Sequence, residues 1–314
     1  MAKDESAFQH QFDPGLTQSY GGRLRRLVNK DGSFNVHRRG VGPRDFHFYQ
    51  FLLSLSWPAF IAIVLVAFVI ANLFFTGLYC AVGIQTLRGA ESHSAGESFL
   101  NAFFFSVQTL TTVGYGSIVP KVVSSNVIAS IEAVLGVMGF AFGAGLLYGR
   151  FSRPSAKILF SSRALIAPYR GKTGLQFRVA NQRANALLDL EATVVLMSVE
   201  GEGESHRRSY AKLELERSLV YFLPLTWTIV HPIDEKSPLY GKTAQDLDDR
   251  AVEILVLIRA FDDTFSQVVN AQCSYRYDEI LWGKKFVPAF RNDEHGHLEL
   301  DLARIDDIET APLA

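Results

Sequence analysis

Two long runs of apolar residues dominate the chain, one from Trp57 to about Val82 and one from about Val122 to Tyr148. An α-helix needs about 20 predominantly apolar residues to cross a bilayer, and each run reaches that length. The alternative is a pair of helices buried in a large soluble core, but buried helices are rarely this long. The pattern therefore predicts two transmembrane helices.

A shorter apolar stretch lies between the two runs. The segment from Ala81 to Glu97 is rich in glycine and serine, which predicts a loop, and Ser98 to Leu110 follows with three consecutive phenylalanines. At about 1.5 Å per residue, a helix over this stretch is too short to cross the bilayer. Non-helical backbone at membrane depth is tolerated only inside protein or against water. We therefore expect a re-entrant helix that runs directly into Thr111.

The first 44 residues are polar and rich in glycine and basic side chains. This composition predicts a mostly extended, solvated arm, and the lack of an apolar run near its start does not favour a signal peptide.

Residues 45–55 are amphipathic, with Phe46, Tyr49 and Leu53 on one helical face. A short aromatic helix beside a membrane span is typical of the bilayer interface.

After Arg153-Pro154 the pattern changes to the short segments of a soluble β domain. Strands are expected at Leu175–Val179, Ala192–Val199, Leu213–Glu216, Trp227–Val230, Ile254–Ile258 and Leu298–Leu302. Many short strands with one helix candidate, near Thr243 to Val252, predict a sandwich. No helix follows Gly201-Glu202-Gly203, so we expect a hairpin turn there and no nucleotide site. The expected domains are an N-terminal arm (1–44), an interfacial helix with a pore domain (45–153) and a β-sandwich (154–314).

Composition and charge narrow the function classes. The formal net charge of −1 argues against a nucleic-acid partner. The two cysteines, Cys80 and Cys273, provide neither a disulfide framework nor a zinc site. No Ser/His/Asp or metal-spaced cluster stands out, so we expect no enzyme and no cofactor. Basic residues lie outside both ends of the apolar pair, which by the positive-inside rule predicts a multi-pass protein of the cell membrane with both termini in the cytoplasm.

The strongest chemical signal is a glycine-alternating motif directly after the short helix: Thr112, Val113, Gly114, Tyr115 and Gly116. Alternating glycines permit left-handed backbone, so that successive carbonyl oxygens can face one side. Four such strands around an axis would replace the hydration shell of K⁺, and TVGYG is the known filter motif of K⁺ channels. A Gly-rich turn is the alternative, but the helix before the motif and the span after it favour a filter.

The second apolar run contains features with two interpretations. Gly139 and Gly143, like Gly145 and Gly149, are four residues apart, which permits close helix packing. The same glycines are equally suited to bending the helix. Glu132 is the acid of this run, and an intramembrane carboxylate is a functional candidate. We favour a hydrogen-bonded brace behind the filter for Glu132.

The expected elements are, in order, an interfacial helix, a span, a short helix, the filter motif, a second span and a β-sandwich. With this order the chain resembles the inward-rectifier potassium channels, and most closely the prokaryotic KirBac type. Besides the filter, the resemblance rests on residues 103–107 (FFFSV), 149–154 (GRFSRP) and 227–241 (WTIVHPIDEKSPLYG). It implies a homotetramer in which an immunoglobulin-like cytoplasmic sandwich extends the pore. It also implies that Phe140 faces the central cavity and that Tyr148 lies at the helix-bundle crossing, where the pore is gated.

The resemblance further implies a site for anionic phospholipids, phosphoinositides among them, at Arg150, Arg153 and Lys157. In strongly rectifying relatives, acids in the cavity and at the cytoplasmic constriction attract polycations, but the corresponding residues here are Phe140 and Arg259. Gln108 also replaces the pore-helix acid common in the family. The alternative function is a membrane-anchored sensor or binding protein that acts through its β-sandwich.

Overall fold

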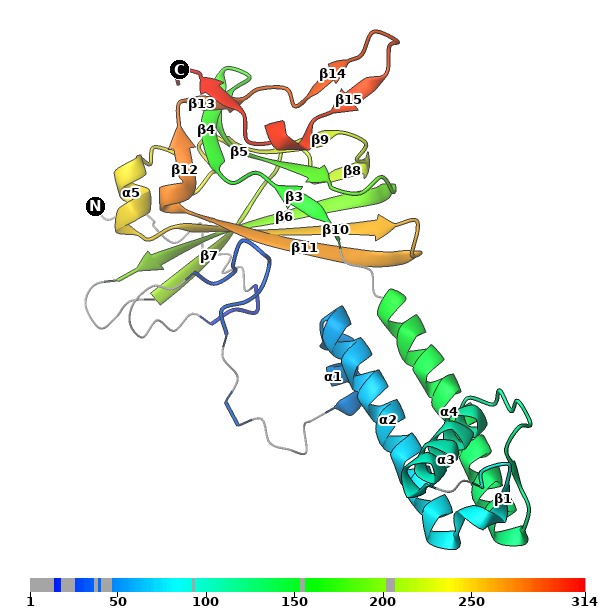
Figure 1. Cartoon of the computed structure of the whole chain (residues 1–314). Helices are drawn as coiled ribbons and strands as arrows, with labels where there is room; N and C mark the ends of the chain where they lie inside the picture. The colour runs from blue at the N-terminus through cyan, green and yellow to red at the C-terminus, as the bar shows by residue number, and fades with distance from the viewer. Residues whose placement is uncertain are drawn as a thin grey trace. The chain divides into compact units, whose positions relative to one another are not determined.

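The structure is a computed structural model that describes residues 14–17, 26–36, 39–40, 47–91, 94–152, 156–201 and 207–313. Its internal contacts divide the chain into two compact units. One unit comprises Arg39–Arg153 and is helical, while the other comprises Met1–Arg38 together with Pro154–Ala314 and is built from β-strands (Figure 1).

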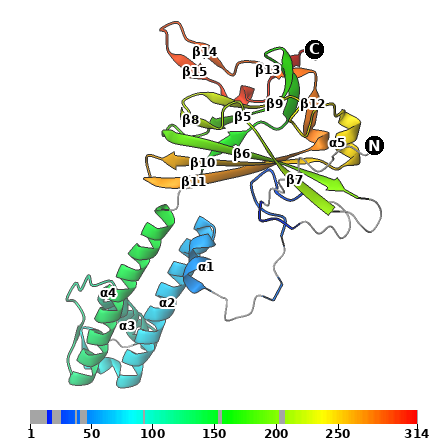
Figure 2. The ribbon, with the colours of Figure 1, turned by 180° about the vertical axis from the view of Figure 1, so that it is seen from behind.

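The helical unit contains four helices, α1 (Phe48–Ser54), α2 (Trp57–Val82), α3 (Ala95–Leu110) and α4 (Val123–Phe151). Of these, α2 and α4 are long and apolar enough to cross a membrane, and they run side by side in both views (Figures 1 and 2). The predicted pair of spans with a short helix between them is therefore confirmed. The helix α3 begins three residues earlier than expected, because Ser94 is its N-cap and Glu97 lies in the first turn, where the helix dipole favours an acid.

Packing around α3 fixes this short helix against α2. The buried side chains Phe75 and Tyr79 of α2 meet Ala102 and Phe105 of α3, and the rings of Tyr79 and Phe105 lie 5.1 Å apart. On its other side, α3 approaches α4 so closely that a methyl group on Gly136 would collide with the carbonyl oxygen of Leu110. The helix α3 is thus held from both sides.

Short pairings join the connections at the end of the helical unit remote from α1. The strand β1 (Leu87–Arg88) pairs antiparallel with β2 (Val119–Pro120), and a 3₁₀ turn (Ile84–Thr86) precedes β1. The hydroxyl of Ser125, in the first turn of α4, donates to the carbonyl of Thr86 at 3.0 Å. The segments before α3 and after the TVGYG motif are therefore tied to each other.

The second unit is a sandwich of two five-stranded sheets. One sheet has the order β11-β10-β6-β7, with β8 paired to β6, and consists of β6 (Leu187–Glu200), β7 (Arg207–Leu213), β8 (Leu219–Phe222), β10 (Glu253–Asp262) and β11 (Gln267–Arg276). The other has the order β12-β4-β5-β3, with β9 paired to β5, and consists of β3 (Ile158–Phe160), β4 (Ala164–Tyr169), β5 (Lys172–Asn181), β9 (Thr226–Ile233) and β12 (Ile280–Trp282). Apolar side chains of both sheets fill the space between them, which confirms the predicted fold class.

Smaller elements complete this unit. The strand pairs β13–β16 (Lys284–Phe286 with Ile308–Thr310) and β14–β15 (Phe290–Asn292 with Leu298–Leu300) lie near the C-terminus. The helix α5 spans Ala244–Asp249, and Thr243 is its N-cap, with a side chain that accepts from the backbone amide of Asp246. The expected helix and cap are therefore confirmed. The strands β6 and β7 pair antiparallel on either side of Gly201, as a hairpin requires, while Glu202 and Gly203 lie outside the described residues.

One expectation about this unit is wrong, and another has one exception. The alternating segment Leu213–Glu216 is no strand beyond Leu213, because its backbone leaves the sheet there and Glu216 donates instead to the carbonyl of Val230 at 2.8 Å. The N-terminal arm is not solvated throughout, since Val28 is 4% exposed and packs on the outer face of the β6/β7/β10 sheet.

Charged contacts hold this part of the arm in place. The guanidinium of Arg26 pairs with the carboxylate of Glu279 at 2.6 Å and also donates to Ser274. The buried carboxylate of Glu253 accepts from the backbone amides of Leu27 and Val28. These contacts explain why the arm is part of the sandwich unit, a long-range arrangement that composition does not reveal.

Candidate filter and gate

The TVGYG segment leaves α3 with a backbone that alternates in handedness. Thr112, Gly114 and Gly116 have φ angles of 59°, 55° and 79°, in the left-handed region. Val113 and Tyr115, between them, are not among the residues with positive φ. Glycine adopts this conformation freely, whereas threonine does so at a cost of about 1–2 kcal/mol. Thr112 is therefore a strained residue that the glycine pattern alone did not predict.

Backbone hydrogen bonds anchor the start of this segment to the end of α3. The amides of Val113 and Gly114 both donate to the carbonyl of Gln108, at 2.9 and 3.2 Å. The hydroxyl of Thr111 turns back to the carbonyl of Val107 at 2.6 Å. The first residues of the motif therefore depend directly on the position of the pore helix.

The side chains of the motif are open within one subunit, with Val113 53% and Tyr115 77% exposed. An extended segment in which every second residue is left-handed can direct consecutive carbonyl oxygens to one side. Carbonyl oxygens so arranged are suited to a dehydrated K⁺ ion. The partial negative charge at the C-terminus of α3 also favours a cation near Thr111.

Glu132 lies behind α3 and is fully buried. Its carboxyl group contacts the hydroxyl of Tyr79 on α2 at 2.7 Å and that of Ser106 on α3 at 2.5 Å. The side chain of Asn72 on α2 approaches the same Ser106 hydroxyl at 3.1 Å. The helices α2, α3 and α4 thus meet at one polar cluster, in agreement with the expected brace.

The two residues expected at the cavity and the gate lie on α4. Phe140 is 81% and Tyr148 75% exposed on the surface of the subunit. Large aromatic side chains left this open on a membrane helix need a lipid, a water-filled pore or another subunit against them. The rest of the helical unit does not cover either side chain, so both are free to face the axis of a pore formed by several subunits.

Arg150 is engaged by the helical unit itself. Its guanidinium donates to the carbonyls of Leu52 and Leu55, at 2.7 and 2.8 Å, and lies 4.6 Å from the ring centres of both Trp57 and Phe60. It therefore connects the last turn of α4 to the end of α1. This role was missed from the sequence, which indicated only the positive charge.

Of the other two expected lipid residues, only Lys157 belongs to the described part of the chain. Arg153 lies outside the described residues. Lys157 belongs to the sandwich unit, where it is exposed and its carbonyl accepts from the amide of Gln182 at 2.8 Å. The ammonium group of Lys157 is thus accessible to solvent, as binding to an anionic headgroup requires.

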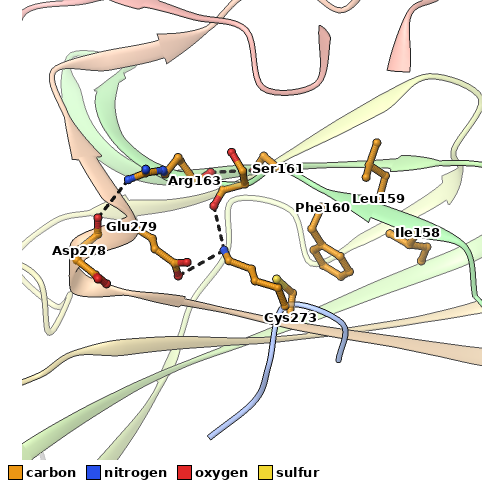
Figure 3. A pocket seen from close by; sticks show the side chains of 10 residues that line it. Ile158, Leu159, Phe160, Ser161, Arg163, Cys273, Asp278 and Glu279 are labelled. Carbon is orange, nitrogen blue, oxygen red and sulfur yellow. Dashed lines mark hydrogen bonds and ion pairs between the residues drawn. The ribbon is translucent and has the colours of Figure 1, made fainter. Parts of the chain in front are cut away.

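A cavity of about 610 Å³ in the sandwich unit involves none of the expected site residues (Figure 3). Its wall includes the edge strand β3, the buried Cys273 and the charged side chains Lys30, Arg163 and Glu279. The ammonium group of Lys30 donates to the carbonyl of Ser162 at 2.9 Å and pairs with Glu279. Burial lowers the pKa of Lys30. These contacts pair the charge of Lys30 with that of Glu279 inside the wall.

The polar contacts of three residues in the helical unit were not predicted from the sequence: Asn72, Ser106 and Tyr79. The place of Tyr79 near the end of the first apolar run had indicated an interfacial anchor, which is wrong because its side chain is fully buried. A signal did exist, because Asn72, Thr76 and Tyr79 are polar positions spaced four and three residues apart in an otherwise apolar span. That spacing places them on one helical face. Polar residues in a membrane span usually face the protein interior.

Comparison with known protein families gives two matches that together cover most of the chain. The family described as "Inward rectifier potassium channel C-terminal domain" matches residues 158–314. The family described as "Ion channel" matches residues 59–151. The first match covers the sandwich from β3 onward, and the second covers α2, α3, the TVGYG segment and α4.

Curated relatives agree with these matches. The chain is 39% identical to "Inward rectifier potassium channel Kirbac3.1" of Paramagnetospirillum magnetotacticum, over 91% of this chain and 96% of that protein. It is 26% identical to "G protein-activated inward rectifier potassium channel 1" of Gallus gallus and of Bos taurus, over 90% of this chain in each case. The chain spans 62% and 60% of the lengths of these two vertebrate proteins.

A solved structure of the sporulation control protein Spo0M from Bacillus subtilis is also similar, with 10% identity over 44% of this chain and 59% of that one. Its TM-score of 0.24 is too low to support any inference about this protein.

Proposed function

The chain belongs to the inward rectifier potassium channel family, and from this premise we propose that four copies form one K⁺-selective pore that conducts ions passively. Membership of a channel family excludes an enzyme. The observation that best supports K⁺ selectivity is the left-handed backbone at Thr112, Gly114 and Gly116. In this proposal Thr112, Val113, Gly114, Tyr115 and Gly116 of each subunit supply the oxygens that replace the hydration shell of the ion.

The gate in this proposal lies on α4. Phe140 would face the cavity below the filter, and Tyr148 would close the bundle of four α4 helices toward the cytoplasm. Their exposure on the subunit surface supports this assignment, because both side chains are left free for a shared axis. The sandwich would extend the conduction path on the cytoplasmic side, with both termini in the cytoplasm and the pore in the inner membrane.

Modulation by anionic lipid is assigned to Arg150, Arg153 and Lys157. Each Lys or Arg near an anionic surface contributes about 1 kcal/mol to the attraction. A phosphate group near Arg150 would compete with the carbonyls of Leu52 and Leu55 for the guanidinium. Lipid binding would thereby change how α1 is held to the end of α4, which is the element that carries the gate.

Rubidium flux into liposomes tests the proposed function. The full-length tetramer should take up rubidium when an outward K⁺ gradient drives the uptake, and it should exclude sodium. The rate of rubidium uptake should change with the content of anionic phospholipid. Protein that is tetrameric but passes no rubidium in any lipid composition would contradict the proposal. That result would favour a membrane-anchored protein that acts through its β-sandwich.

A further inference from the structure

A buried polar cluster behind the filter links α2, α3 and α4. It consists of Asn72, Tyr79, Ser106 and Glu132, each of which has no exposed surface. Two oxygens of the cluster, Glu132 Oε1 and Asn72 Oδ1, face the one hydroxyl of Ser106, at 2.5 and 3.1 Å. The number of hydrogens available for these contacts decides the charge of the carboxyl group.

The orientation of the Asn72 amide is fixed by its other neighbour. Its Nδ2 lies 2.7 Å from the carbonyl oxygen of Phe68, which can only accept a hydrogen bond. The amide nitrogen must therefore face Phe68, and the acceptor Oδ1 faces Ser106. The backbone carbonyl of Asn72 already accepts from the hydroxyl of Thr76 at 2.7 Å, so it does not need the Ser106 hydrogen.

An ionised Glu132 leaves this cluster one hydrogen short. The hydroxyl of Tyr79 donates to Oε2 of Glu132, and the single hydrogen of Ser106 can serve either Oε1 of Glu132 or Oδ1 of Asn72. Whichever oxygen is left faces the lone pairs of Ser106 at contact distance. A buried acceptor without a hydrogen costs about 1–3 kcal/mol.

A neutral Glu132 satisfies every atom of the cluster. The carboxylic O–H donates to the Ser106 oxygen, Ser106 donates to Oδ1 of Asn72, and Tyr79 donates to the remaining carboxyl oxygen. We propose that Glu132 is held as a neutral carboxylic acid, and that as a positioning residue it fixes α3 and thereby the filter. The second part of this inference rests on the proposed function.

The surrounding helices supply no charge that would favour the ionised form. Tyr79 is the titratable side chain in contact with Glu132 from α2, and α2 contains no Asp, Glu, Lys, Arg or His. The charged residue of α3 is Glu97, in its first turn, and α4 carries Arg150 only at its opposite end. Burial of a carboxylate without a cation has a high free-energy cost, so the protonated form of Glu132 is favoured.

The effect on the filter follows from the position of Ser106 on α3. Ser106 precedes Gln108 by two residues, and the carbonyl of Gln108 holds the amides of Val113 and Gly114. A hydrogen bond between Glu132 and Ser106 thus fixes the turn of α3 from which the filter begins. Loss of the proton from Glu132 would remove one hydrogen bond of the series that positions the filter.

Infrared difference spectroscopy tests the protonation state directly. In the full-length tetramer at neutral pH, we expect the carbonyl band of a protonated carboxylic acid, sensitive to deuteration and absent from the Glu132→Gln variant. The band does not depend on conduction, so it decides this part even if the channel passes no ions. Absence of the band from wild-type protein would overturn the proposal.

Flux measurements test the positioning role. Gln can replace the neutral acid bond for bond, so Glu132→Gln should retain selective rubidium flux within about twofold at neutral pH. Glu132→Ala removes the acceptor of the Tyr79 hydroxyl and one of the two partners of Ser106, so it should lower the ratio of rubidium flux to sodium flux about tenfold or more. As pH rises, wild type should lose selectivity while Glu132→Gln does not.

The matched control is Ser130→Ala, two residues earlier on α4, whose hydroxyl bonds only to its own helix at Asn126. It should leave selectivity and its pH profile unchanged. A tetrameric Glu132→Gln protein as impaired as Glu132→Ala would overturn the neutral acid. Equal and normal selectivity in all three variants would overturn the positioning role.

Discussion

At the scale of single residues, the proposed filter depends on backbone conformations that few side chains tolerate. Gly114 has a φ of 55°, and a Cβ built there meets no atom of the subunit within 4 Å. The penalty for a side chain at this position therefore comes from the backbone itself rather than from a collision. The same reasoning identifies Thr112 as a position where strain is accepted.

We expect Gly114→Ala to abolish K⁺-selective flux. Left-handed backbone costs an alanine about 1–2 kcal/mol, and the cost recurs in each of the four subunits. The measurement is rubidium uptake into liposomes by protein verified as tetrameric. Gly77→Ala, on α2, is the control, because Gly77 also has open space around it but lies in ordinary helical backbone. Selective uptake by Gly114→Ala would rule out the filter assignment.

His231 makes a residue-scale prediction in the sandwich. Its ring nitrogens contact the carbonyl of Glu214 and, at 2.7 Å, the hydroxyl of Ser237, and burial lowers the pKa of His231. Unfolded histidine titrates near a pKa of about 6.5, so below that pH the unfolded chain binds a proton that the folded one resists. The free energy of unfolding should therefore be highest above about pH 6.5 and fall as the pH drops through the folded-state pKa.

Thermal unfolding of the full-length protein between neutral and mildly acidic pH measures this effect. His231→Gln should be less stable at neutral pH but should show a weaker decline on acidification. The exposed His297, changed to Gln in the same way, is the control and should keep the slope of the parent. An identical slope in His231→Gln would show that another group is responsible.

At the scale of elements, the short helix α3 is positioned by its two neighbours. Against α2 the contact is made by apolar rings and by Asn72, and against α4 it is made by Glu132 and by the lack of a side chain at Gly136. For Gly136 this supports close packing over bending. Gly139, Gly143 and Gly145 have open space within the subunit, so their role is decided in the assembly.

Gly136→Ala should push α3 away from α4. The added methyl group would overlap the backbone oxygen of Leu110, which cannot rotate away as a side chain does. Overpacking of this kind typically costs about 1–3 kcal/mol, so we expect a lower unfolding temperature and reduced selective flux. Gly139→Ala on the same helix has no such neighbour in the subunit and serves as the control. Equal behaviour of the two variants would contradict this contact.

The connection between α1 and α4 gives a second element-scale prediction. Changing Arg150, Arg153 and Lys157 together to Gln should weaken the response to phosphoinositide, by about 1 kcal/mol for each charge removed. The measurement is the dose response of rubidium flux, whether the lipid activates or inhibits. Lys285→Gln with Arg291→Gln, at two exposed positions on β13 and β14, is the control and removes two positive charges elsewhere in the sandwich unit. An unchanged dose response in the triple variant would reject the site.

At the scale of the whole molecule, rectification depends on charges that four subunits bring to one axis. A cytoplasmic polycation is held in a narrow pore by acidic side chains whose attraction is poorly screened. Here the expected cavity residue Phe140 is neutral, and the expected constriction residue Arg259 is exposed and basic. Two acids lie near Arg259 in the sequence: Asp262 is buried and accepts from the amides of Thr264 and Phe265, whereas Asp263 is exposed and offsets part of the repulsion by Arg259.

We therefore expect weak block by cytoplasmic spermine, strengthened in Phe140→Asp, which places four carboxylates in the cavity. Single-channel recording at a series of voltages is the measurement. Phe142→Asp, a neighbouring exposed position on α4, tests whether the effect requires the cavity face. Steep micromolar block of the unmodified channel would show that the assignment of the pore-lining residues is wrong.

Features that depend on neighbouring residues could be predicted from the sequence. The length of the apolar runs predicted α2 and α4, and the shortness of Ser98 to Leu110 predicted a helix that does not span. The glycine spacing marked the filter, and the short alternating segments predicted the sandwich. Each of these signals is local, because the lengths and periods of helices and strands are set by backbone geometry.

Contacts between groups far apart in the sequence became known only from the folded chain. It paired Glu132 with Ser106 and Tyr79, directed Arg150 to the carbonyls of α1, and placed Val28 on the sandwich. It also ended β7 at Leu213, where the alternation of the sequence continues. Hydrogen-bond partners and burial depend on the packing of elements far apart in the chain, and periodicity within one segment carries no information about that packing.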